Sequence, residues 1–96
     1  MNALFRQGKT ALVQEYIDPL LYRNRKFDIR CYALVLSFRG KLKAFWYKEG
    51  YVRTCSKEFS DDIKDQYAHL TNDAIQKKYP FYGKYEQANK LSFGDL

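Results

Sequence analysis

Apolar and polar side chains alternate along residues 26–36, and this period of two predicts a β-strand. One face of the strand is apolar throughout: Phe27, Ile29, Cys31, Ala33 and Val35. The other face is charged in its first half and apolar in its second: Lys26, Asp28, Arg30, Tyr32, Leu34 and Leu36. We expect a strand that runs from a polar cleft into the core. The alternative is a ladder of ion pairs on a solvated face, since exposed ion pairs are common and contribute little.

Turn-forming residues divide the next part of the chain into short strands. Gly40 lies in a turn over residues 37–41 and is free to adopt a positive φ, so residues 42–47 return as an antiparallel strand. A second turn over residues 48–50 leads to a third strand over residues 51–55. The pattern predicts a meander of at least three antiparallel strands.

An apolar run over residues 11–17 becomes polar towards its end and stops at Asp18-Pro19. Proline favours extended geometry at the residue before it and ends a strand. We therefore expect a buried strand whose last residues offer backbone N–H and C=O groups to a ligand: Gln14, Glu15, Tyr16 and Ile17. An ordinary sheet edge is the alternative.

The second half of the sequence predicts short helices. Ser60-Asp61-Asp62 supplies a cap and an acidic first turn for a helix around residues 63–67. Residues 69–72 interrupt the helical pattern, and residues 73–79 form a short element that ends at Pro80. The predicted fold class is α+β, an antiparallel strand meander with short helices.

Charge is unevenly distributed along the 96 residues. The net charge is +6, and residues 1–60 hold 12 Lys or Arg against 5 Asp or Glu. This excess favours an anionic partner, such as a nucleotide, a nucleic acid, an anionic lipid or an acidic peptide. The two cysteines lack metal-ligand spacing, and there is no long apolar run or signal peptide, so we expect a cytoplasmic protein with reduced thiols.

Four charged residues are candidates for binding such a partner. Lys26 and Arg30 can bind phosphate oxygens, and Asp28 between them can accept hydrogen bonds from ribose hydroxyls or orient the two cations. Arg53 follows a glycine turn on the third strand, which would bring it towards Arg30. The alternative for each arginine is a solvated surface residue.

Three residues after the first predicted helix are weaker candidates. Thr71 and Asn72 have short polar side chains that suit a ligand or metal site, but stabilising a turn is their default role. His69 is the only histidine, and it has no Cys, Asp or Glu at metal-ligand spacing, so we interpret it as structural.

Four motifs in order give a more specific indication. The motifs are Val-Gln-Glu-Tyr-Ile at 13–17, Arg-Lys-Phe-Asp-Ile-Arg at 25–30, Tyr-Lys-Glu-Gly-Tyr-Val-Arg at 47–53 and His-Leu-Thr-Asn at 69–72. With them, the sequence resembles the tubulin tyrosine ligase and ligase-like family of ATP-grasp enzymes over roughly residues 12–93.

The resemblance implies roles for the candidate residues. Residues 14–17 correspond to the hinge whose backbone receives adenine, Lys26 and Asp28 to nucleotide contacts, and Thr71 with Asn72 to a pair at the ATP site. Arg30 and Arg53 are similar to catalytic arginines near the γ-phosphate and the acceptor carboxylate.

The implied activity is the ATP-dependent addition of an amino acid, tyrosine or glutamate, to the tubulin C-terminal tail through an acyl phosphate. The implied partners are that tail and a free amino acid, with no nucleic acid or membrane, and the location is cytoplasmic and microtubule-associated. The sequence leaves the oligomeric state open.

The resemblance implies that residues 1–96 are a partial ATP-grasp domain. This part lacks the family's upstream phosphate-binding lobe and its downstream metal-ligand segment. The cofactors would be ATP and Mg²⁺, with the Mg²⁺ ligands outside this chain, so we expect residues 1–96 alone to be inactive. The alternative is a small basic β-rich module that binds nucleic acid or acidic peptides, with stacking on Phe45, Tyr47 and Tyr51.

Overall fold

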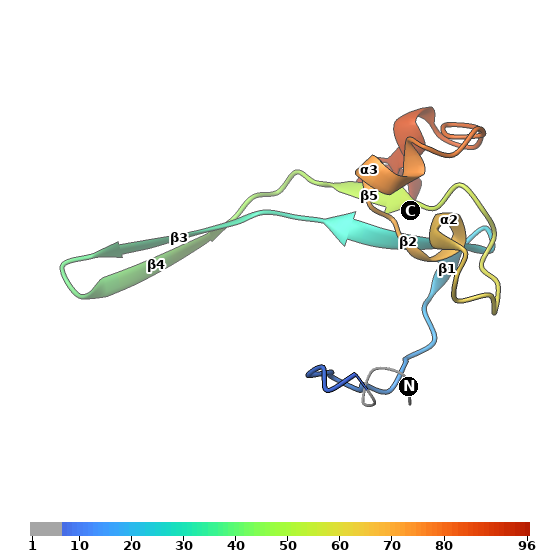
Figure 1. The fold of residues 1–96 in the computed structure, drawn as a ribbon. Coiled ribbons are helices and arrows are strands. Elements are labelled where there is room, and N and C mark those ends of the chain that lie inside the picture. Colours follow the sequence, from blue (N-terminus) through green and yellow to red (C-terminus); the bar gives the residue numbers. More distant parts are fainter. Residues whose placement is uncertain (1–6) are drawn as a thin grey trace.

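The structure is a computed structural model that describes residues 7–96 (Figure 1). It contains a four-stranded sheet in the order β1-β2-β5-β6 and a separate hairpin of β3 and β4. The strands are β1 (Leu21–Tyr22), β2 (Arg25–Arg30), β3 (Ala33–Phe38), β4 (Lys41–Trp46), β5 (Tyr51–Thr54) and β6 (Lys90–Leu91). The helical elements are α2 (Gln66–His69), α3 (Asp73–Gln76) and the 3-10 turns η1 (Gln87–Asn89) and η2 (Phe93–Asp95). Every strand pair is antiparallel, which confirms the predicted α+β class.

The predicted single strand over residues 26–36 is wrong, because the chain leaves the strand conformation at residues 31–32. β2 pairs with β5, and β3 pairs with β4, so the predicted meander is also wrong. The chain instead forms one long hairpin with a break in the middle. The turn at its tip is confirmed, because Arg39 and Gly40 both have positive φ in a two-residue loop that joins paired residues Phe38 and Lys41.

A bulge accounts for the break in the long hairpin. Arg30 pairs with Tyr51, whereas Tyr47 N donates to Tyr32 O at 3.0 Å. Between these two contacts, Cys31 on one side faces three residues, 48–50, on the other. Extra residues on one strand interrupt the ladder and change the twist of the sheet, so the two halves of the hairpin are separate sheets.

Gly50 permits close packing at this bulge. A Cβ atom at position 50 would lie 2.4 Å from the backbone oxygen of Arg30 and 2.4 Å from the Phe93 ring. Any side chain would therefore force β2 and η2 away from the bulge, which explains the glycine.

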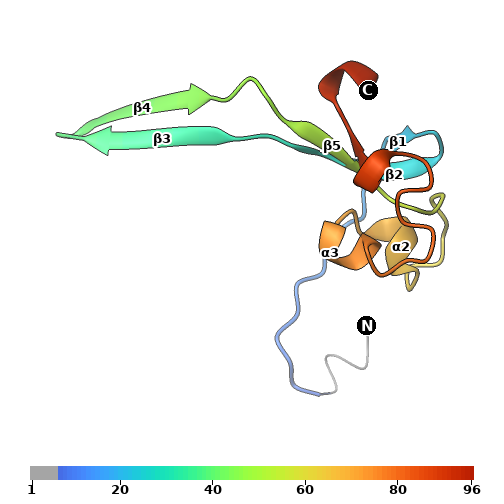
Figure 2. The same ribbon diagram turned by 90° about the horizontal axis from the view of Figure 1, so that it is seen from above.

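The β3–β4 hairpin extends away from the rest of the fold, as Figures 1 and 2 both show, and we call it the arm. All twelve of its strand residues are exposed. One face carries no charged residue: Ala33, Val35, Ser37, Leu42, Ala44 and Trp46. The radius of gyration is 17.8 Å, against about 12 to 13 Å for a compact chain of this length. The expectation that this strand enters a core is therefore wrong for the part of the chain that the structure describes.

A buried polar network holds the C-terminal segment against the four-stranded sheet. Arg25 is only 2% exposed and forms a bidentate ion pair with Glu86, including a bond of 2.8 Å from Nη1 to Oε2. Thr54 Oγ1 also donates to Glu86 Oε2 at 2.8 Å, and Asn89 Nδ2 donates to Thr54 O at 3.1 Å. These contacts join β2, β5 and η1, and all the buried side-chain nitrogen and oxygen atoms within residues 7–96 have hydrogen-bond partners.

The two short helices lie together on one side of β2 and β5 (Figure 2). The predicted cap at residues 60–62 is wrong, because α2 begins after Asp65, whose side chain accepts from Tyr67 N at 3.1 Å. Gln76 at the end of α3 is fully buried and accepts from Ser56 N at 2.9 Å, while its Nε2 donates to Leu70 O at 2.6 Å. One amide therefore ties α3 to the loops on either side of α2.

The predicted buried strand over residues 11–17 is wrong. This segment forms no strand, and Leu12 and Ile17 are 90% and 80% exposed. Apolar composition alone misled the prediction, because a strand needs a neighbour, and the four-stranded sheet begins only at β1.

We predict that Trp46, the only tryptophan, reports directly on the arm. It is 68% exposed, so its fluorescence should be red-shifted and quenched by acrylamide almost as readily as that of a free tryptophan amide. Trp46→Phe should abolish the signal. Blue-shifted emission with slow quenching at low protein concentration would contradict the exposed arm.

We also predict that the Arg25–Glu86 pair controls stability against acid. Burial alone would raise the pKa of Glu86, but hydrogen bonds from Arg25 and Thr54 outweigh this effect and hold the pKa below its ordinary 4.5. As the pH falls below about 4.5, the unfolded chain therefore binds a proton at Glu86 more readily than the folded chain does. The ionised Glu86 thus stabilises the fold fully above about pH 4.5, and this stabilisation is lost as the pH falls further.

Glu86→Gln should therefore cost roughly 3 to 5 kcal/mol at neutral pH, because it leaves the Arg25 guanidinium buried without its anion. Its unfolding free energy should also change less between pH 7 and pH 3.5 than that of the wild type. Urea unfolding followed by circular dichroism measures both quantities. Glu49→Gln, the same change at an exposed position, is the matched control, and equal stability of the two variants would refute the prediction.

Candidate functional site

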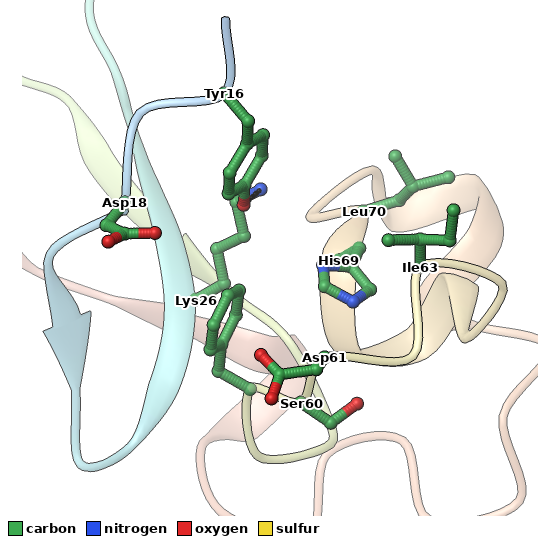
Figure 3. Close-up of a pocket in the computed structure, with 9 residues that line it drawn as sticks. Tyr16, Asp18, Lys26, Ser60, Asp61, Ile63, His69 and Leu70 are labelled. Carbon is green, nitrogen blue, oxygen red and sulfur yellow. Dashed lines mark hydrogen bonds between the residues drawn. The ribbon is translucent and has the colours of Figure 1, made fainter. Parts of the chain in front are cut away.

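A pocket of about 460 Å³ lies between the N-terminal segment, β2 and the loop that leads to α2 (Figure 3). In the figure, Tyr16 and Lys26 form one side, and Ile63, His69 and Leu70 form the other. The complete lining is Tyr16, Asp18, Lys26, Phe59, Ser60, Asp61, Ile63, His69 and Leu70. Aromatic and aliphatic walls with a few charged groups are typical of a small-molecule site.

Lys26 provides the cation of this pocket. Its Nζ donates to the Tyr16 hydroxyl at 3.1 Å and lies 5.3 Å from the centre of the Tyr16 ring. The contact joins β2 to the extended N-terminal segment. Asp18 and Asp61 also line the pocket, so the ammonium group shares it with two carboxylates.

Asp28, two residues along the same face of β2, anchors a second group of polar side chains. Arg53 is its direct cross-strand partner on β5 and donates from Nε to Oδ1 at 2.8 Å and from Nη2 to Oδ2 at 2.5 Å. Thr71 Oγ1 donates to Oδ2 at 2.8 Å. We call Asp28, Arg53 and Thr71 the Asp28 cluster. Leu70 lines the pocket and Thr71 follows it in the chain, so the cluster and the pocket are neighbours.

The cluster keeps Asp28 ionised. Partial burial alone would raise its pKa, but hydrogen bonds from Arg53 and Thr71, together with the charges of Arg53 and Arg30, lower the pKa below its ordinary 3.8. The pKa of Arg53 is correspondingly raised, first by its hydrogen bond to Asp28. Near neutral pH, the cluster is therefore an ion pair with a hydroxyl group attached.

The structure brings together five of the residues that the sequence selected. Tyr16 and Lys26 meet in the pocket, and Asp28, Arg53 and Thr71 meet in the cluster. The Thr71 side chain contacts a charged residue of the sheet, which goes beyond the default role in a turn. Arg53 contacts Asp28, whereas the sequence led us to expect it near Arg30.

Five selected residues lie outside both groups. Gln14, Glu15 and Ile17 are exposed on the extended segment, although Tyr16 beside them lines the pocket. Arg30 is exposed at the end of β2, with its guanidinium 5.6 Å from the centre of the Tyr32 ring. Asn72 precedes α3 and its side chain makes no capping hydrogen bond.

His69 has a structural role and is also part of the pocket wall. Its Nε2 lies 3.0 Å from Asp62 O, and its ring packs edge-on against Phe59 with centroids 5.3 Å apart. These contacts fit the structural interpretation of His69. Sequence reasoning did not place His69 in the pocket lining, and it also missed Phe59 and Ile63. The sequence signal that could have placed His69 there is its position directly before Leu70 and Thr71.

Residues 7–96 contain neither a metal-binding cluster nor a membrane-spanning helix. This part of the chain contains no group of three or more His, Cys, Asp or Glu side chains placed to bind a metal ion. No helix in the same range has the length and apolar character needed to cross a membrane.

Comparison with known proteins identifies the class. The sequence model of the Tubulin-tyrosine ligase family matches residues 2–95, almost the whole chain. The chain therefore belongs to the tubulin-tyrosine ligase family, which confirms the resemblance seen in its motifs.

Individual relatives are tubulin polyglutamylases and tubulin glycylases by name. The probable alpha-tubulin polyglutamylase Ttll1 of Tetrahymena thermophila is 46% identical over 87 residues, which are 86% of this chain and 20% of that protein. The probable tubulin polyglutamylase TTLL9 of Bos taurus is 45% identical over 73 residues, covering 74% of this chain and 16% of its own length. Tubulin glycylase 3B of Drosophila melanogaster is 42% identical over 74 residues, covering 76% of this chain and 10% of that protein. The chain thus spans a fifth or less of the length of these relatives.

Proposed function

We propose that this chain is part of an ATP-dependent ligase that adds an amino acid to the C-terminal tail of tubulin. The observation that carries the proposal is the position of Lys26 and Asp28 on one face of β2, with Lys26 in the pocket and Asp28 in the adjoining cluster. In this proposal residues 1–96 are part of an ATP-grasp domain, and further segments supply the phosphate-binding lobe and the metal ligands.

The donor set of the pocket fits a nucleotide. Its volume of about 460 Å³ lies within the range of small-molecule sites, and Phe59, Ile63 and Leu70 offer apolar surface to a planar base. Lys26 would bind phosphate oxygens, and Asp28 would accept from a ribose hydroxyl. The backbone of Gln14, Glu15, Tyr16 and Ile17 would receive the edge of the base, and Thr71 and Asn72 would close the site.

The reaction explains why cations are needed nearby. In the proposed reaction the γ-phosphoryl group passes to an acceptor carboxylate, which gives an acyl phosphate and ADP. The amine of the incoming residue then attacks the carbonyl carbon, and phosphate leaves. The first step brings anionic groups together, so Arg30 and Arg53 would lower its cost by offsetting charge at the phosphate and the acceptor. Mg²⁺ would neutralise phosphate charge when bound, through ligands outside this chain.

The partner follows from the family and the charge. The relatives are named for glutamylation and glycylation of tubulin, and we propose a tubulin tail as the acceptor here too, with a free amino acid as co-substrate and a microtubule-associated location. Residues 1–60 carry an excess of seven positive charges, from 12 Lys or Arg and 5 Asp or Glu, which would attract an acidic tail. Tyrosine and glutamate both remain in the proposal as the amino acid that is added.

We predict that Lys26→Ala weakens ATP binding to the 96-residue chain by about tenfold or more, because a charge-assisted contact contributes roughly 1.5 to 3 kcal/mol. NMR titration of the isotope-labelled chain with ATP measures the affinity even when it is weak. The amide signals of residues 14–17 and 69–72 should shift. Lys43→Ala on the arm removes the same charge away from the pocket and should bind ATP as the wild type does.

Two outcomes would oppose the proposal. Unchanged signals around the pocket in saturating ATP would remove the nucleotide site. Steeply salt-dependent binding of single-stranded RNA that requires Phe45 and Tyr47 would favour the nucleic-acid module instead. Because the proposal places the metal ligands elsewhere, residues 1–96 should show no turnover with ATP, Mg²⁺, amino acid and tubulin, and turnover would refute that part.

A further inference from the structure

The two sides of the β2–β5 pair carry the same arrangement of side chains. On one side, Glu86 accepts a bidentate contact from Arg25 and a hydroxyl bond from Thr54. On the other side, Asp28 accepts a bidentate contact from Arg53 and a hydroxyl bond from Thr71. In both clusters one carboxylate oxygen accepts two hydrogen bonds and the other accepts one.

The two clusters differ in exposure. The side chains of Arg25 and Glu86 are 2% and 7% exposed, whereas those of Arg53 and Asp28 are 23% and 36% exposed. A carboxylate has about four acceptor directions, and the described contacts occupy three on Asp28. Two of these fall on Oδ2 and one falls on Oδ1, so Oδ1 keeps one acceptor direction on a side chain that is 36% exposed.

Position on the sheet relates this acceptor to the pocket. Asp28 lies two residues from Lys26, about 7 Å along the same face of β2. Thr71 follows Leu70, which lines the pocket. The buried Glu86 cluster fixes the backbone from the opposite side, since Arg25 precedes Lys26 and Thr54 follows Arg53. The Asp28 cluster therefore lies next to the pocket, on strands that the Glu86 cluster anchors from the opposite side.

We infer that Thr71 and Arg53 are positioning residues that fix the Asp28 carboxylate so that Oδ1 accepts a single ligand hydroxyl, thereby making the site selective for one ribose hydroxyl of a nucleotide. This inference rests on the proposed function and adds to it a source of ligand selectivity. Arg53 would have this positioning role in addition to its proposed contact with the acceptor carboxylate of the tubulin tail. Without the Thr71 hydroxyl, Oδ2 gains an open direction and the carboxylate can rotate, so the preference for one hydroxyl weakens.

The test compares ATP, 2′-deoxyATP and 3′-deoxyATP as ligands of the 96-residue chain by NMR titration. In the wild type, one deoxy analogue should bind about tenfold or more weakly than ATP, and the other within about twofold of it. Thr71→Val keeps the side-chain shape but removes the donor, and should reduce the larger ratio to about threefold or less. Thr71→Ser keeps the hydroxyl and should restore the discrimination.

Thr54→Val is the matched control, because it removes the equivalent hydroxyl from the buried cluster. It should lower the stability of the fold and leave the ratio between ATP and its deoxy analogues unchanged. If Thr71→Val does not fold, Arg53→Lys tests the same inference. Lysine keeps the charge but loses the bidentate contact with Asp28, so this variant should also reduce the ratio between the affinities for ATP and the weaker deoxy analogue.

The outcomes separate the two proposals. If the wild type binds none of the three nucleotides, the proposed function itself fails. If it binds all three with equal affinity, or if Thr71→Val discriminates as well as the wild type, the nucleotide site stands and the positioning role is overturned. A pH titration provides a second readout, because the loss of the Thr71 bond should raise the pKa of Asp28 and move the acid limit of ATP binding to higher pH.

Discussion

The buried ion pair between Arg25 and Glu86 is the interaction on which the rest of the structure depends. It joins the first residue of β2 to the C-terminal segment, across 61 positions of sequence, and it leaves neither charge exposed to water. A buried charge is tolerated only when its partner is present and its remaining hydrogen bonds are satisfied, so the pair specifies one arrangement of these segments. Thr54 and Asn89 complete the network and bring β5 into the same arrangement. The residues next to this network in the chain, Lys26 and Arg53, are those of the candidate site.

The same combination of arginine, carboxylate and threonine thus occurs twice on one pair of strands. The two copies differ in burial. Because the Glu86 side chain is only 7% exposed, the Glu86 cluster has little access to any ligand and holds the fold together. The Asp28 cluster is accessible, so its strength is lower and its carboxylate can still meet a ligand. An antiparallel pair makes this division simple, since neighbouring residues on each strand point to opposite faces and each cluster takes one residue from each strand.

The sequence predicted the parts of this arrangement that depend on local pattern. Alternation placed Lys26, Asp28 and Arg30 on one face, and the turn at Gly40 was correct. Residues 48–50 were predicted as a turn between strands, whereas they form a bulge within one hairpin. Phe93 approaches Gly50 at this bulge, and such a tertiary contact leaves no periodic signal in the sequence. The partner of Arg53 was also missed, because cross-strand register depends on the length of that bulge. The start of α2 was predicted three residues early, since three acidic residues near it are all suitable caps and only Asp65 accepts a hydrogen bond from a helix backbone N–H with its side chain.

The arm and the site are physically coupled, because β3 and β4 continue the strands that hold Asp28 and Arg53. Within residues 7–96, the fully buried apolar side chains are Val52, Cys55 and Ala68, and side chains this small contribute little hydrophobic free energy. The larger apolar side chains of the arm, such as Phe45 and Trp46, are more than half exposed. Anything that covers the arm would bury larger apolar side chains than the three that are now fully buried. It would also restrain β2 and β5, since the bulge joins the two halves of the hairpin covalently and through Tyr47 and Tyr32. Burial of the arm and order in the Asp28 cluster should therefore increase together.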